Sequence, residues 1–205
     1  MATGKLADQG EKLVKNAKEA IKEELIVLWE HLPQWQRDNQ YIVRGYRKAT
    51  NSYRKSFASL GYIHNETVNI YTHLLGSLAF ACLAPSFYNL IKSGYSAQAS
   101  TEDIYVFACF FVGAVFCLGM SATYHTISNH SEAVHKFGNK LDYFGIILLI
   151  WGSFVPCIYY GFGCHPEWMN TYWTMVCVRY LRTSVLRLRL NGNYRSPQWL
   201  LLAAL

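Results

Sequence analysis

The stretch from Ser121 to Phe162 decides the fold of this chain. It reads Ser-Ala-Thr-Tyr-His-Thr-Ile-Ser-Asn-His-Ser over 121–131, Lys-Leu-Asp-Tyr-Phe-Gly-Ile over 140–146 and Gly-Ser-Phe-Val-Pro-Cys-Ile-Tyr-Tyr-Gly-Phe over 152–162. His125 lies at the end of one membrane-length apolar run, and Asp142 lies at the start of the next. Ionisable groups inside or at the edge of the hydrocarbon are costly, so this pair is a candidate for function.

Long apolar runs dominate the chain after residue 66. Of the 205 residues 52% are hydrophobic, and three runs are long enough to cross a membrane as helices, at 67–91, 104–126 and 141–163. Each exceeds the ~20 residues that span a hydrocarbon core. A fourth run begins at Thr171 and is interrupted by Arg179 and Arg182, which predicts a partial span at 171–178. The predicted fold class is an all-α multi-pass membrane protein.

The charge distribution divides the chain into regions. We predict a cytoplasmic amphipathic or interfacial region, a transmembrane helical domain and a basic tail, at 1–66, 67–178 and 179–205. Residues 10–32 have apolar side chains at helical spacing, which predicts an amphipathic helix that ends at Pro33. This helix either packs on the protein or lies in the membrane interface. Residues 40–60 mix aromatic side chains with Arg and Lys, which predicts a second short helix along the membrane surface.

The orientation follows from the basic residues near the spans. Residues 1–66 hold 11 of the 19 Lys and Arg residues, and the connection that follows the third span, at 165–170, holds none. This bias predicts an integral membrane protein with a cytoplasmic N-terminus, in the plasma membrane or an endomembrane. The net charge of +6 is explained by topology and contact with headgroups, so we expect no nucleic-acid partner. Both glycosylation sequons, at Asn65 and Asn129, fall on the predicted cytoplasmic side and should be unmodified.

Polar residues of three predicted spans fall at the same depth in the membrane. Asn69 and His73 are one turn apart near the start of the first span, and Ser121 and His125 have the same spacing at the end of the second. Asp142 begins the third span on the same side. Sixteen residues separate His125 from Asp142, yet the topology returns both to one leaflet.

This cluster has two readings. Imidazole is a good zinc ligand and carboxylate serves as a ligand or a supporting base, so His125 and Asp142 could share a metal ion or a water molecule. A catalytic zinc takes three protein ligands, however, and one histidine with one aspartate is too few. The other reading is structural, with hydrogen bonds of Asp142, His125 and Ser121 closing the helix hairpin.

Two stretches resemble the signatures of the progestin and adipoQ receptor family, also described as adiponectin receptor-like or hemolysin III-related. The stretch 64–76, which reads His-Asn-Glu-Thr-Val-Asn-Ile-Tyr-Thr-His-Leu-Leu-Gly, resembles the first signature. The second is similar to the run from Ser121 through His125 and Asp142 to Tyr160. The resemblance covers about residues 32–178.

The resemblance implies a seven-helix membrane receptor with a cytoplasmic N-terminus and a zinc ion near the cytoplasmic leaflet. By position, His125 matches a zinc-binding histidine, Asp142 matches the aspartate that holds the zinc-bound water, and Ser121 matches a serine beside that site. The implied activity is hydrolysis of a lipid amide of the ceramide type, or lipid-linked reception in lipid, sterol and zinc homeostasis. The implied partners are membrane lipids, such as ceramide or sterol.

The chain departs from the family pattern at its C-terminal side. The family's other two zinc histidines form an H-x-x-x-H pair in the seventh span, and no such pair occurs in this sequence. The recognisable pattern stops near Val178. We therefore expect a partial copy of the seven-helix bundle, truncated after the third or fourth span, with an incomplete zinc ligand set. Such a chain would form a homo-oligomer or pair with a full-length copy. The alternatives are a non-catalytic receptor or regulator and an inactive fragment.

Overall fold

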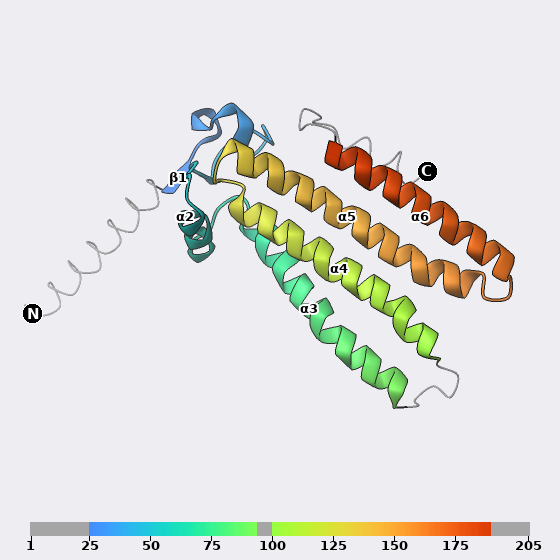
Figure 1. Ribbon diagram of the computed structural model, residues 1–205. Helices are drawn as coiled ribbons and strands as arrows, with labels where there is room; N and C mark the ends of the chain where they lie inside the picture. Colours follow the sequence, from blue (N-terminus) through green and yellow to red (C-terminus); the bar gives the residue numbers. More distant parts are fainter. Residues whose placement is uncertain (1–24, 94–99, 190–205) are drawn as a thin grey trace, which may run out of the picture.

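The computed structural model describes residues 25–93 and 100–189, and within these ranges four long helices lie side by side (Figure 1). They are α3 (Thr67–Lys92), α4 (Thr101–Ile127), α5 (Glu132–Gly161) and α6 (Pro166–Arg189). Of these, α3, α4 and α5 are long and apolar enough to cross a membrane. The predicted class, an all-α multi-pass membrane protein, is confirmed.

Two of the helices extend beyond the predicted spans. α5 begins at Glu132, nine residues before the predicted start, because the Ser131 side chain accepts a hydrogen bond from the Val134 N–H and caps the helix there. The residues before 141 are largely polar, so hydropathy alone did not include them. α6 begins at Pro166, a residue suited to the first helical turn, and continues through Arg179 and Arg182. The arginines that end the apolar run therefore do not end the helix.

Glycines allow α4 and α5 to approach each other closely. A methyl group added at Gly145 would lie 2.9 Å from the Cα of Cys117, and one at Gly113 would lie 2.9 Å from the main-chain oxygen of Leu148. At Gly152 it would overlap the main-chain oxygen of Cys109. Small residues of this kind are typical of helix interfaces in membranes, where van der Waals packing drives association.

Residues 25–66 cover one end of the bundle, where α3 begins, α4 ends and α5 begins; we call this the capped end. Strands β1 (Ile26–Val27) and β2 (Tyr46–Arg47) pair antiparallel, with the 3-10 turns η1 (Trp29–His31) and η2 (Gln34–Gln36) between them. The helix predicted over 10–32 is wrong in its last part, because residues 26–31 form β1 and η1. Ile26 and Val27 pair with β2, and the Trp29 N–H donates to the main-chain oxygen of Val43, in place of a helical ladder. The earlier residues of that prediction lie outside the described ranges.

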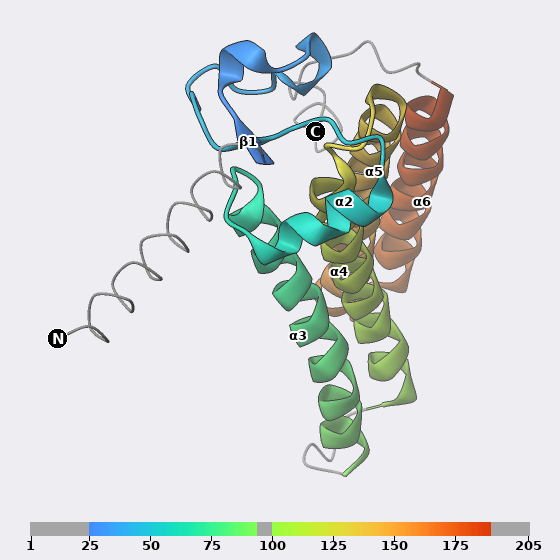
Figure 2. The same ribbon diagram turned by 90° about the vertical axis from the view of Figure 1, so that its left-hand side faces the viewer.

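The short helix expected within 40–60 is present as α2 (Tyr53–Ala58), which is followed by the 3-10 turn η3 (Ser59–Gly61). The Ser52 side chain caps α2 by accepting from the Lys55 N–H. Figure 2 shows α2 lying across the end of α3 and α4 rather than in line with them. Ser56 and Ser59 are fully buried beneath it, so its opposite side faces outward.

Candidate functional site

A hydrogen-bonded cluster of polar side chains lies where α3 begins and α4 ends. Glu66 is the N-cap residue of α3, and Asn69 and His73 follow on its first two turns. Ser121 and His125 lie in the last two turns of α4. Because both helix termini are at the capped end, residues more than 50 positions apart meet there.

Two short contacts join α3 to α4 within this cluster. The His125 Nδ1 lies 2.8 Å from the Glu66 Oε2, and the Asn69 side-chain amide donates to the same oxygen at 2.9 Å. The His73 Nδ1 lies 2.7 Å from the Ser121 Oγ. The two imidazole rings are neighbours, with centroids 6.0 Å apart. Four of the five residues singled out from the sequence thus lie in this cluster, and Glu66 links two of them, Asn69 and His125.

The Glu66 carboxylate fixes the tautomer of His125. Burial tends to raise the pKa of Glu66, but the hydrogen bonds from His125 and Asn69 and the charge of Arg47 outweigh burial and lower it below its usual value. The carboxylate is therefore ionised at neutral pH and can only accept hydrogen bonds. The proton must then be on Nδ1 of His125, and in the neutral ring the Nε2 lone pair is free to act as a ligand or base.

Asp142 lies on α5 and does not join this network. Among the described residues, no hydrogen bond or ion pair to its carboxylate is formed. On α5, Gly138 packs against Tyr124 of α4 and Gly145 packs against Cys117. Asp142 lies between these two glycines and is therefore near the level of Ser121, but no hydrogen bond or ion pair joins it to His125.

Arg47 is a central residue of the capped end that the sequence did not single out. Its side chain is 2% exposed and donates to the main-chain oxygens of His125 and Thr126, at 2.6 and 2.8 Å. It also donates to the hydroxyls of Ser59 and Ser128. Burial lowers the pKa of Arg47 to about 10, opposed by the nearby Glu66 charge, so the guanidinium stays charged at neutral pH. A cation at this position complements the negative end of α4 and satisfies its last carbonyls.

Glu66 was also missed as a site residue. The sequence offered one signal, since Glu66 precedes Asn69 by three residues and His73 by seven, so all three share a helical face. Glu66 otherwise stands out only as part of the sequon at Asn65 and of the signature-like stretch 64–76. For Arg47 there was no such signal, because it belongs to a basic and aromatic stretch that suggests a membrane surface.

The described residues do not provide a complete zinc site. Within the described ranges, no three His, Cys, Asp or Glu side chains are placed to hold one metal ion. What is present is one histidine whose second nitrogen is held by a carboxylate, which is the usual outer-shell arrangement of a zinc-binding histidine. All seven histidines of the chain lie within the described ranges, so further histidine ligands are not available from the rest of it.

The fold and this site define a multi-pass helical membrane protein with an ionisable cluster at one end of its bundle. The family model described as "Haemolysin-III related" matches residues 61–204. The chain is 42% identical over 172 residues to "Adiponectin receptor protein" of Drosophila melanogaster, covering 84% of this chain and 37% of the relative. It is 46% identical over 153 residues to "Progestin and adipoQ receptor-like protein 1" of Caenorhabditis elegans, covering 75% of this chain and 34% of the relative.

A fungal relative is similar to the same degree. "ADIPOR-like receptor IZH2" of Saccharomyces cerevisiae is 41% identical over 151 residues, covering 73% of this chain and 46% of the relative. The chain belongs to the haemolysin-III-related family, which includes the progestin and adipoQ receptors. It matches between 34% and 46% of the length of these three relatives.

Proposed function

We propose that this chain carries one part of a zinc-dependent site that hydrolyses lipid amides of the ceramide type, in a receptor family of lipid and zinc homeostasis. The observation that supports this most is the 2.8 Å contact between the His125 Nδ1 and the Glu66 carboxylate. It prepares Nε2 as a ligand in the way that outer-shell carboxylates prepare zinc-binding histidines. The names of the relatives support a receptor family.

The other residues of the cluster have supporting roles in this proposal. Ser121 holds His73 beside the ring of His125. Asp142 is a carboxylate without a described hydrogen-bond partner, which suits it to orient a water molecule or to accept its proton. Since a zinc site of this class needs three protein ligands, the remaining ones come from a second copy or another polypeptide segment.

A non-catalytic receptor or regulator is the second candidate. It is favoured by the contacts that the cluster already makes, because each of His73, Ser121, His125 and Glu66 has a partner within it. It is also favoured by the absence of three ligands among the described residues. In this case the polar cluster would bind a lipid headgroup or hold the helices in register, without chemistry.

Zinc content and ceramide turnover, measured together, separate these candidates. The test uses the chain isolated from its native membrane with the proteins it binds and placed in lipid nanodiscs, alongside the His125→Ala and Asp142→Asn variants. The control is His165→Ala, since His165 is exposed at the opposite end of α5. We expect wild type and control to hold zinc and release fatty acid from ceramide. His125→Ala should lose both properties, and Asp142→Asn should lose turnover while retaining zinc.

Two results would overturn the proposed hydrolase activity. Turnover that is unchanged in both variants would show that these residues take no part in it. Wild-type chain without zinc and without turnover would leave the non-catalytic receptor as the function.

A further inference from the structure

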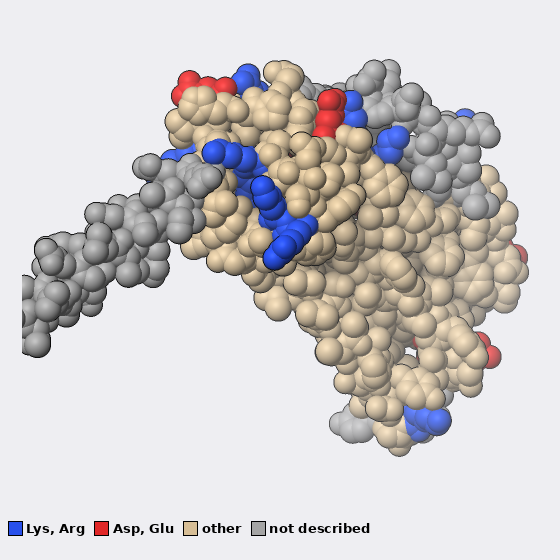
Figure 3. All heavy atoms as spheres, turned by 60° about the vertical axis from the view of Figure 1, so that its left-hand side comes forward, with Lys and Arg blue, Asp and Glu red and all other residues tan. Residues whose placement is uncertain are grey.

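The outward side of the capped end carries a group of exposed basic side chains. Lys48, Arg54 and Lys55 are exposed, and we call these three the basic face. Figure 3 shows Lys and Arg side chains in a line over this side of the molecule, with no acidic side chain interrupting it. Among the described residues none forms an ion pair with any of the three. No described acidic side chain therefore neutralises these three charges.

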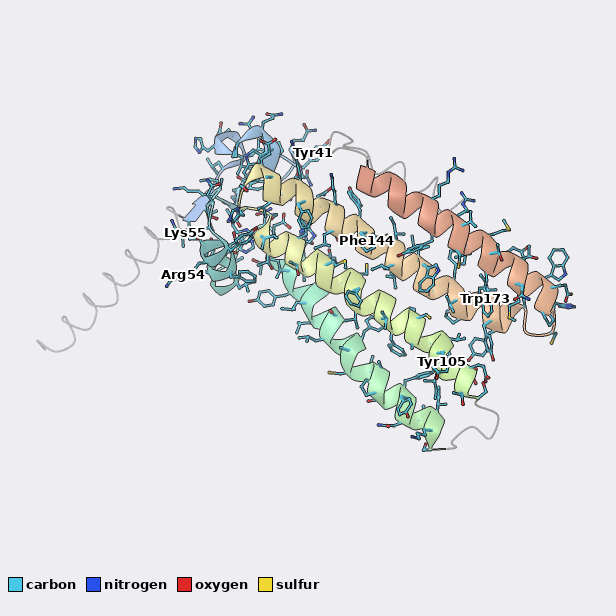
Figure 4. All side chains as sticks on the ribbon, in the orientation of Figure 1. Tyr41, Arg54, Lys55, Tyr105, Phe144 and Trp173 are labelled. Atoms are coloured by element: carbon cyan, nitrogen blue, oxygen red, sulfur yellow. The ribbon has the colours of Figure 1, made fainter. Side chains whose placement is uncertain are left out.

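Aromatic side chains accompany these charges on α2. Tyr53 and Phe57 are separated by one helical turn and are 51% and 53% exposed. Figure 4 shows Arg54 and Lys55 on the side of α2 that is turned away from the long helices. A short helix that exposes both aromatic rings and cationic side chains is typical of a membrane–water interface.

The structure holds α2 beside the end of the spanning helices. α2 lies across the end of α3 and α4 (Figure 2), and the spanning helix α3 begins nine residues after α2 ends, at Thr67. The Tyr71 hydroxyl donates to the main-chain oxygen of Leu60, which ties η3 to the first turns of α3. The loop that precedes α2 is folded onto it, because the Thr50 hydroxyl lies 3.4 Å from that of Ser56. The basic face is thus held close to where the hydrocarbon ends.

We propose that the basic face binds the phosphate groups of anionic lipids in the leaflet that meets the capped end, with Phe57 inserted among their acyl chains. Charge complementarity and position both favour a lipid over an acidic protein, since a layer of phosphates lies at this height wherever α3 spans a membrane. Each basic residue near an anionic surface contributes about 1 kcal/mol, which corresponds to roughly a fivefold change in affinity. Binding should weaken as salt rises, because the three side chains are exposed.

The test counts bound phosphatidylserine by native mass spectrometry on the full chain in detergent that contains phosphatidylserine and phosphatidylcholine. We expect the triple variant Lys48→Gln, Arg54→Gln, Lys55→Gln to lose affinity for phosphatidylserine by on the order of 100-fold. The charge-conserving triple Lys48→Arg, Arg54→Lys, Lys55→Arg should bind like wild type. Lys92→Gln removes one charge at the opposite end of α3 and should also have no effect.

Several outcomes would overturn the proposal. One is unchanged phosphatidylserine binding in the glutamine triple variant, whose melting temperature should equal that of wild type because all three side chains are exposed. A loss of phosphatidylserine affinity in Lys92→Gln equal to that of the glutamine triple variant would show that net charge, not this face, attracts the lipid. Tighter binding of soluble polyglutamate than of phosphatidylserine would assign the face to an acidic protein instead.

Discussion

The guanidinium of Arg47 and the main-chain oxygen of His125 lie 2.6 Å apart, although the two residues are 78 positions apart in the sequence. Through this contact the segment before the membrane holds the end of α4 that carries the polar cluster. The Thr50 N–H donates to the main-chain oxygen of Asn129, and the Asn51 N–H donates to the main-chain oxygen of His130. The capped end is therefore attached to the turn between α4 and α5 along several residues.

Replacing Arg47 should strongly destabilise the protein. Arg47→Met leaves the buried carbonyls of His125 and Thr126 without their donor, and we expect a loss of about 3 kcal/mol in the free energy of unfolding. Arg47→Lys retains the charge but cannot reach four acceptors with one ammonium group, so its loss should be intermediate. Thermal unfolding in detergent measures both. A wild-type melting temperature for Arg47→Met would show that the helix end does not depend on this residue.

The close approach of α4 and α5 should fail when a methyl group is added at Gly152. That group would overlap the main-chain oxygen of Cys109, and a backbone atom cannot move aside as a side chain can. We expect Gly152→Ala to cost about 1–3 kcal/mol. Gly161 is on the same helix with nothing within 4 Å of an added methyl, so Gly161→Ala is the matched control. If Gly152→Ala and Gly161→Ala have the same melting temperature, the distance between the two helices does not depend on Gly152.

His64 should make the stability depend on pH. It is 6% exposed, and burial together with the charge of Arg47 lowers its pKa to about 4, against about 6.5 in an unfolded chain. Between these values the unfolded chain binds a proton that the folded chain does not. The contribution of His64 is therefore complete above pH 6.5 and decreases as the pH falls toward 4.

The control for this prediction is His64→Asn. The Nδ1 of His64 accepts from the Glu66 N–H at 3.1 Å, and an asparagine oxygen can take that role without titrating. Melting temperatures measured from pH 7 to pH 4 should fall less steeply in the variant. Parallel curves for wild type and variant would contradict the assignment to His64.

The predicted orientation can be tested at Cys164, which is exposed between α5 and α6 at the end of the bundle opposite the capped end. With a cytoplasmic N-terminus, Cys164 faces the outside or the organelle lumen. For chain at the cell surface, a membrane-impermeant maleimide should label intact cells, and Cys164→Ser should abolish this signal. Labelling that requires permeabilised membranes would reverse the topology. Asn65 should remain unglycosylated; Asn129 is less informative because it is 2% exposed.

The spanning helices were largely predictable, whereas the capped end was not. Hydropathy placed the start of α3 at Thr67, because each side chain of such a run faces either lipid or another helix. The same criterion missed the polar first turns of α5, where the Ser131 cap decides the boundary. Residues 26–31 have a helical pattern but form a strand and a turn, because Ile26 and Val27 pair with β2 and the Trp29 N–H donates to the main-chain oxygen of Val43.

At the candidate site, the sequence predicted which helix ends meet but not which side chains form hydrogen bonds there. The meeting of His73, Ser121 and His125 follows from an antiparallel pair of helices and was expected. The contact of Glu66 with His125 depends on the side chain of an N-cap residue, and the sequence does not state which way that side chain turns. Two of the four acceptors of the Arg47 side chain are main-chain oxygens, which carry no signal in the residue pattern.

The attachment of Arg47 to the end of α4 also sets the order of events during synthesis. Residues 25–66 leave the ribosome before α4 is made, and Arg47 must wait for about 80 more residues before its acceptors at the end of α4, the main-chain oxygens of His125 and Thr126, exist. At 5–20 residues per second this delay is roughly 4–16 seconds. The first spanning helices are made while Arg47 still lacks these acceptors. Residues 25–66 are therefore translated before the spanning helices but reach their final structure only after α4 is complete, and until then the Arg47 guanidinium must remain in water.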